Sequence, residues 1–236
     1  MAIYHLSVRI VKRSQGQSAV AVAARRSGER LFDRRLDLHV RPEGGGAPAV
    51  AEILLPKDAP AWLGAREELW NTAEATEKRL DAQLAREVEL ALPIELTNTE
   101  AIELAREFVQ REFVTRGMVA DLTIHLGGGH NPYANAMLTL REVTAQGFGR
   151  KVREWNQSGL LREWREQWAA LANAYLARAG HAVRIDHGRK RDQAGQEMPA
   201  AVHLGKAAKA MQQRGLKHAR LQRLEEQGGQ PAKDRA

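Results

Sequence analysis

Short runs in which apolar and polar residues alternate recur along the chain, and they constrain its fold more than any other feature. Alternation of period two places one side of a strand against a core and the other side against solvent or a ligand. The clearest runs cover residues 4–10, 84–92, 118–126 and 133–141, and a shorter apolar run covers 50–55. Because helical spacing separates most of these runs, the sequence predicts an α+β fold. We expect a central antiparallel sheet of about five strands flanked by helices, with one sheet face open.

The expected helices follow from the spacing of apolar residues and from capping signals. Ser18 is a suitable N-cap for an alanine-rich helix that we expect to end near Phe32, and the glycine-rich stretch 39–48 should be irregular. Trp62, Leu69, Trp70 and Ala73 should form the buried stripe of a second helix. The expected helices cover residues 18–32, 58–79, 98–116 and 160–179.

The composition excludes several classes of protein. The 236 residues contain no cysteine, which removes disulfides, thiolate nucleophiles and cysteine-bound zinc. No apolar run approaches the roughly 20 residues that span a bilayer, and the N-terminus lacks the apolar centre of a signal peptide. We therefore expect a folded, soluble, cytoplasmic protein without membrane insertion.

The positive charge is concentrated at the C-terminal end. Between His187 and Arg223 there are nine lysines or arginines against two carboxylates, Asp192 and Glu197. Such a segment favours polyanions through counterion release, with nucleic acid as the leading partner and an acidic membrane surface behind it. A solvated basic helix is the alternative. We expect a domain over residues 1–186 and a basic, partly helical extension over 187–236.

The polar sides of the expected strands would meet on one sheet face. That face should carry His5, Ser7, Arg9, Glu87, Glu89, Asp121, His125, Tyr133 and Asn135. Any one-sided sheet has a polar outer face, so an ordinary solvated surface is one interpretation. A surface that binds or transforms a ligand is the other.

Eight sequence blocks along the chain allow a more specific interpretation. In order they are AIYHLSV, QSAVAVAARRSGERLFD, EILLP, AREVELALP, MVADLTIH, NPYANAMLTLREV, GFGRKVREWN and HAVRIDH. Together they resemble the MobA/MobL relaxase domains of conjugative and mobilisable plasmids, over residues 1–211. The resemblance implies an antiparallel sheet flanked by helices, and a single-strand DNA transesterase whose tyrosine attacks a phosphodiester at a transfer origin.

The resemblance also implies a set of site residues, and this chain departs from it. Arg25 stands where the family carries its nucleophilic tyrosine. Three histidines usually hold a divalent metal, Mg²⁺ or Mn²⁺; Tyr133 and Asn135 occupy two of those positions and His125 keeps the third. Glu87 matches an acidic position of the family and is a candidate for orienting a ligand or accepting a proton. A phenol and an amide are weak donors beside imidazole, so metal binding should be weak or absent.

These departures favour a relative that binds plasmid DNA, single-stranded or hairpin, at a transfer origin without nicking it. Arg25 would place a permanent cation where a phosphate passes, and guanidinium binds phosphate in a bidentate manner. The candidate DNA-binding residues are His5, Arg9, Arg25, Arg26, Arg141, Lys151, Arg189, Lys190 and Arg191.

Two alternatives remain open at the level of sequence. An active nickase could use another tyrosine, Tyr133 before Tyr4, or recruit His130 from a loop as a metal ligand. The chain could instead be a plasmid regulator or accessory protein that contacts other mobilisation proteins in the bacterial cytoplasm.

Overall fold

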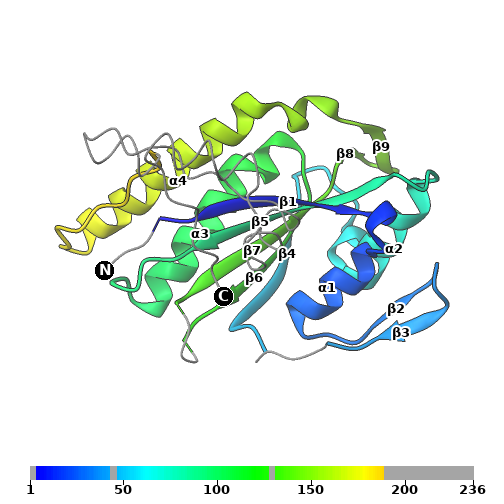
Figure 1. Ribbon diagram of the computed structural model, residues 1–236, viewed down its shortest axis with the longest axis horizontal. Helices are drawn as coiled ribbons and strands as arrows, with labels where there is room; N and C mark the ends of the chain where they lie inside the picture. The colour runs from blue at the N-terminus through cyan, green and yellow to red at the C-terminus, as the bar shows by residue number, and fades with distance from the viewer. Residues whose placement is uncertain (1–3, 43–46, 128–130, 189–236) are drawn as a thin grey trace, which may run out of the picture. The chain divides into compact units, whose positions relative to one another are not determined.

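A computed structural model describes residues 4–42, 47–127 and 131–188, and all of these except Gly188 belong to a compact unit covering Met1–His187. Its centre is a five-stranded sheet in which every neighbouring pair is antiparallel, as predicted (Figure 1). Across the sheet the strands are β1 (Leu6–Lys12), β5 (Gln83–Ala91), β7 (Tyr133–Leu138), β6 (Ala120–His125) and β4 (Val50–Leu54). The α+β class is therefore confirmed.

Two long helices cover one face of this sheet (Figure 1). They are α3 (Asn98–Glu112) and α4 (Ser158–Arg178). The apolar sides of the strands, including Val88, Leu122 and Ala136, are buried beneath them together with Trp164 and Trp168. Thr97 begins α3 with a reciprocal capping box, in which its hydroxyl accepts from the Glu100 backbone while the Glu100 side chain accepts from Thr97. This is the core that the alternation predicts.

The opposite sheet face is covered over part of its length. The helices α1 (Ala19–Ser27) and α2 (Arg66–Thr76) pack there against Ala85, Val119 and Met137 in a second apolar cluster. Further along β7 the same side of the strand carries polar residues, beginning with Asn135. The expected open face is therefore restricted to the end of the sheet where its residues become polar.

The first helix is shorter than the sequence suggested. Ser18 caps it as expected by accepting a hydrogen bond from the Ala21 amide, but the helix ends at Ser27 rather than near Phe32. Gly28 adopts the left-handed conformation, with φ of 74°, that terminates helices. The next residues form a hairpin of β2 (Leu31–Asp33) and β3 (Leu38–Val40). The expectation that 39–48 is irregular is therefore wrong for residues 39–40, which lie in β3.

The second helix is also shorter than expected, and one residue of its stripe is misplaced. A 3₁₀ turn covers Ala61–Gly64 before α2 begins at Arg66. Leu69, Trp70 and Ala73 are buried, but Trp62 is 39% exposed. Trp62 lies against Gly147 in the turn of a second hairpin, β8 (Arg141–Thr144) and β9 (Gly147–Lys151), which the sequence did not indicate. The third helix, expected over 98–116, ends at Glu112, and a 3₁₀ turn over Val114–Arg116 follows it, closed by Gly117 in the left-handed conformation.

One buried ion pair anchors α2 to the sheet. Asp121 on β6 accepts hydrogen bonds from Nε and Nη2 of Arg66 at 2.9 to 3.0 Å and from the Trp70 indole at 2.8 Å. Arg66 also contacts Glu29. Asp121 was expected on the open polar face, but α2 covers it and it is only 3% exposed. Its partners satisfy the charge that burial would otherwise penalise.

No helix within 4–42, 47–127 and 131–188 is long and apolar enough to cross a membrane. The basic extension expected after residue 186 lies almost entirely outside these residues, and with it Arg189, Lys190 and Arg191.

Candidate functional site

Two rings stack at the polar end of the open sheet face. His125 and Tyr133 lie directly opposite one another on β6 and β7, so both point to the same side of the sheet. Their ring centroids are 4.6 Å apart and the planes differ by 13°. Two of the three positions that the family resemblance assigned to metal ligands are therefore adjacent, and their side chains contact each other.

Asn135 and Glu87 are joined beside this stack. Asn135 lies two residues beyond Tyr133 on the same side of β7, and its Nδ2 donates to Oε1 of Glu87 at 3.1 Å. The same carboxylate oxygen accepts from Arg26, at 2.6 Å from Nε and 2.5 Å from Nη2. Asn135 is 1% exposed, and its Oδ1 has no hydrogen-bond partner. Arg26 therefore neutralises the charge of Glu87 from the last turn of α1.

The charge of Arg26 also acts on His125. Burial lowers the pKa of His125 below its ordinary value of 6.5, and the nearby positive charge of Arg26 lowers it further. The imidazole is therefore neutral at neutral pH. The sequence analysis named Arg26 as a candidate DNA contact but did not predict its effect on the pKa of His125. In the sequence, this effect is indicated only by the two adjacent arginines of the ARRSG block.

The second carboxylate of the face, Glu89, lies near three basic side chains. His5 Nε2 lies 3.5 Å from Oε1 of Glu89, and Arg9 Nη2 lies 3.7 Å from its Oε2. Arg26 reaches the same Oε2 at 3.8 Å. His5 and Arg9 thus lie on the open face as the alternation predicts, and Arg9 is exposed.

Arg25 lies at the surface, one residue before Arg26 on α1. In the described part of the chain it makes no hydrogen bond and no ion pair. With Arg26 and Glu87 it lines an open groove of about 390 Å³ that runs along β1, here called the β1 groove, whose polar lining also includes Arg9 and Lys12. The structure therefore brings Arg25 to the same groove as Glu87, but it is Arg26 that contacts the carboxylates of Glu87 and Glu89.

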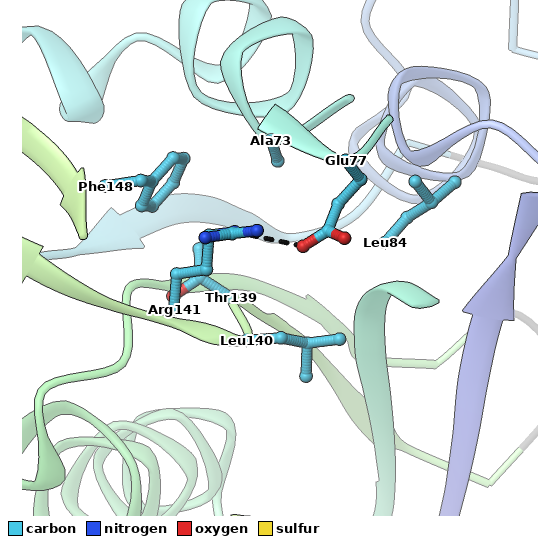
Figure 2. A pocket seen from close by; sticks show the side chains of 7 residues that line it. All are labelled: Ala73, Glu77, Leu84, Thr139, Leu140, Arg141 and Phe148. Carbon is cyan, nitrogen blue, oxygen red and sulfur yellow. Dashed lines mark hydrogen bonds and ion pairs between the residues drawn. The ribbon is translucent and has the colours of Figure 1, made fainter. Parts of the chain in front are cut away.

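Arg141 and Lys151 lie elsewhere. Arg141 Nε is 3.0 Å and Lys151 Nζ is 3.1 Å from Oε1 of Glu77. Arg141 and Glu77 line a small recess together with Phe148 (Figure 2). This recess lies beyond the Leu138 end of β7, whereas Tyr133 begins the strand. Five residue steps along a strand separate the two ends by about 17 Å. The structure thus separates these two cations from the site. His130 lies outside the described residues.

The donor set does not suit a divalent cation. Among residues 4–42, 47–127 and 131–188 no three histidines or carboxylates form a group that could hold a metal ion. The three positions assigned to metal ligands offer the imidazole of His125, the phenol of Tyr133 stacked on it, and the amide of Asn135, whose nitrogen faces Glu87. Arg26 neutralises the carboxylate, and its charge would oppose a second cation beside His125.

The coupling between Arg26 and His125 can be tested by titration. We expect an NMR titration to give His125 a pKa below 6.5, and Arg26→Ala to move it upward because one of the two depressing causes is removed. In the unaltered protein the pKa of His125 is lower in the folded state than in the unfolded state, so the unfolded chain binds the imidazole proton more tightly. His125 should therefore lower the free energy of unfolding as the pH falls below about 6.5. Arg30→Ala, an exposed charge that does not act on His125, is the control. A His125 pKa at or above 6.5 in the unaltered protein would contradict the arrangement.

Comparisons with known proteins agree with this fold. Residues 17–214 match the model of the MobA/MobL family. A probable conjugal transfer protein TraA of Sinorhizobium fredii is 36% identical over 91% of this chain. The match covers 22% of that relative, so the chain spans about a quarter of its length or less.

Two solved structures share the architecture. One, described as the molecular basis of vancomycin resistance transfer in Staphylococcus aureus, is 33% identical with a TM-score of 0.74, and the match covers 80% of this chain and 100% of that one. The other is the conjugative relaxase TrwC in complex with oriT DNA, a metal-bound structure. It has a TM-score of 0.52 at 11% identity, covering 98% and 93% of the two chains, and shows likeness of fold alone.

Proposed function

The chain belongs to the MobA/MobL family, and from that premise we propose that it binds single-stranded or hairpin DNA of a plasmid transfer origin without nicking it. The observation that carries the proposal is the network of Arg26, Glu87 and Asn135 beside the stacked pair His125 and Tyr133. In this place the family resemblance implies a histidine-bound metal and a tyrosine nucleophile. We also propose residues 1–186 as the relaxase-like domain and 187–236 as a basic extension that adds affinity for DNA.

DNA binding is supported by the cations around the β1 groove. Arg25 has no partner within the described residues, and Arg9 and Lys12 line the same groove. Unpaired guanidinium groups are suited to phosphate, which they bind through two parallel hydrogen bonds. The net charge of +7 favours a polyanion over an acidic ligand.

The absence of nicking is supported by the chemistry of the three replaced positions. Arg25 has no hydroxyl that could attack a phosphodiester, and its guanidinium is always protonated. Asn135 is committed to Glu87 and lies beneath the surface. A neutral imidazole flanked by Arg26 is then the main donor for a metal that would polarise the scissile phosphate, and a single imidazole is a weak site.

Another tyrosine is poorly placed to take over the attack. Burial raises the pKa of Tyr4 to about 12, so its phenolate is scarce at neutral pH. Tyr4 also packs against the core beneath α3 and α4, on the covered side of the sheet. Tyr133 is the remaining candidate at the site, and its ring is stacked on His125.

The test combines binding with a search for covalent product. Purified protein is titrated with oligonucleotides from a transfer-origin region in single-stranded, hairpin and duplex form. The mixtures are then run on a denaturing gel after incubation with Mg²⁺ or Mn²⁺. We expect binding that weakens linearly with the logarithm of salt, by about 0.7 log units per tenfold salt for each phosphate contact on a single strand, and no adduct.

Three outcomes would contradict the proposal in different ways. A covalent adduct that disappears in Tyr133→Phe would establish a nickase with a displaced nucleophile. Equal affinity for single-stranded, hairpin and duplex DNA would favour an accessory protein that uses DNA as a platform. No binding at all would remove DNA as the ligand of this chain.

A further inference from the structure

A second open groove lies on the other side of α1. It is bounded by α1 and by the hairpin β2–β3, which runs alongside the helix (Figure 1). This hairpin groove has a volume of about 410 Å³, similar to the β1 groove, and Arg25 lines both. Its six lining residues are Ala21, Arg25, Leu38, His39, Val40 and Arg41. Arg25 therefore stands on a ridge between two basic grooves.

Among the described residues, the charge of the hairpin groove is positive and has no acidic partner. Arg25 and Arg41 are exposed, and within the described residues neither makes a hydrogen bond or an ion pair. The arginines in the turn of the same hairpin differ, because Arg34 pairs with Glu68 and Arg35 pairs with Glu74. No lining residue is acidic. The cations without partners are thus the ones that face the groove.

The floor of the groove offers an apolar surface. Leu38 is 45% exposed although it lies in a strand, and Val40 lines the groove beside it. The His39 ring lies on the other face of the hairpin, where it packs against Phe32 with centroids 5.0 Å apart. Unpaired cations beside exposed apolar atoms suit a single nucleic-acid strand, whose phosphates and bases they can contact.

We propose that the hairpin groove is a second binding segment for a single nucleic-acid strand, with Arg25 and Arg41 on its phosphates and Leu38 and Val40 against its bases. The strand would cross α1 at Arg25 and continue into the β1 groove, so that one strand occupies both. This deepens the proposed function and rests on it. It assigns a binding role to Arg41, which lies in the stretch 39–48 that the sequence indicated would be irregular.

The experiment measures affinity for oligo-dT of 4, 8, 12 and 16 nucleotides by fluorescence anisotropy, across a series of salt concentrations, with the full chain. Arg41→Ala should weaken binding of the longer oligonucleotides roughly fivefold at 0.1 M salt and reduce the salt slope by about 0.7, the values for one lost phosphate contact. Arg41→Lys should recover most of the affinity, because it keeps the charge. Leu38→Ala should weaken binding of the longer oligonucleotides without changing the salt slope, because it removes an apolar contact and no charge.

Arg162→Ala is the matched control. Arg162 is exposed on α4, which covers the opposite sheet face, and it makes no hydrogen bond or ion pair in the described part of the chain. We expect its affinity and salt slope to equal those of the unaltered protein. Because Arg41 is exposed, we expect its substitution to leave the melting temperature unchanged. Equal melting temperatures of all variants will show that a loss of affinity comes from binding and not from unfolding.

Two results would overturn the inference, and they can be told apart. If Arg41→Ala behaves like Arg162→Ala while Arg25→Ala weakens binding, DNA is bound without the hairpin groove and the proposed function stands. If the unaltered protein binds none of these oligonucleotides nor the origin-region DNA, the groove and the proposed function fall together.

Discussion

The triple variant Arg25→Tyr, Tyr133→His, Asn135→His is expected to cleave single-stranded origin DNA in Mn²⁺ and to remain attached to the product, whereas the unaltered chain does neither. Each change supplies what the family resemblance implies and this chain lacks. The first provides a phenol on α1, and the other two provide imidazoles on β7, on the same side of the sheet as His125. Because the surrounding strands already exist, the change tests chemistry rather than fold.

The network at Glu87 gives a structural reason to expect a functional metal site. Asn135 now donates to Glu87 at 3.1 Å, and a histidine at that position could donate its ring N–H to the same carboxylate. Metal-bound histidines are usually oriented in this way, and loss of such an outer partner alone costs roughly 10–100-fold in affinity. We therefore expect Mn²⁺ binding, measured by calorimetry, to strengthen by more than about 100-fold.

A matched variant separates metal binding from attack. Arg25→Phe with Tyr133→His and Asn135→His keeps the two imidazoles and the ring but lacks the hydroxyl. It should bind Mn²⁺ as tightly as the tyrosine variant and form no covalent product on a denaturing gel. Cleavage by the unaltered chain, or equal Mn²⁺ affinity before and after substitution, would contradict our interpretation of the three positions.

Asp121→Ala is expected to cause the largest loss of stability of any single polar substitution considered for this domain. Asp121 accepts from Arg66 and Trp70 beneath α2, and the change would leave the Arg66 guanidinium buried without its main carboxylate. Breaking a buried pair from one side costs about 3–5 kcal/mol. In a domain of this size that lowers the melting temperature by roughly 2–4 °C per kcal/mol.

The exposed pair of Arg79 and Asp81 provides the control. Its Nε and Oδ1 atoms are 2.9 Å apart, the same distance as the closest contacts of the buried pair, but the two side chains are 82% and 65% exposed. Asp81→Ala should change the free energy of unfolding by less than about 1 kcal/mol in a urea titration. Equal losses for Asp81→Ala and Asp121→Ala would show that burial does not set the value of the Arg66 pair.

The sheet could be predicted because its pattern is local. Alternation in the segments around Val88, Leu122 and Ala136 assigns each strand an inner and an outer side, and all three lie in the core beneath α3 and α4. The family resemblance was confirmed by the match of residues 17–214 to the MobA/MobL model. Positions that face one another in the register, such as His125 and Tyr133, then follow from the pairing.

The expectations that failed depended on contacts between distant segments. Trp62 has helical spacing with the buried stripe, but it lies in a 3₁₀ turn and contacts the β8–β9 turn instead. Asp121 alternates with apolar residues of β6 and was therefore expected on the open polar face, but α2 covers it. Arg141 is basic and near a family block, but Glu77 binds it at the far end of β7.

The sequence alone determined the α+β class, the sides of the central strands and the family, and it carries Arg25, Tyr133 and Asn135 at positions where the family resemblance implies other residues. These properties depend on residue type and short spacing, which a chain carries before it folds. Only the tertiary structure decided that Arg26 binds Glu87, that α1 and α2 cover part of the polar face, and that Arg25 lines two grooves. Such facts depend on how α1, α2 and the β2–β3 hairpin pack on the sheet, and packing joins residues that no local pattern connects.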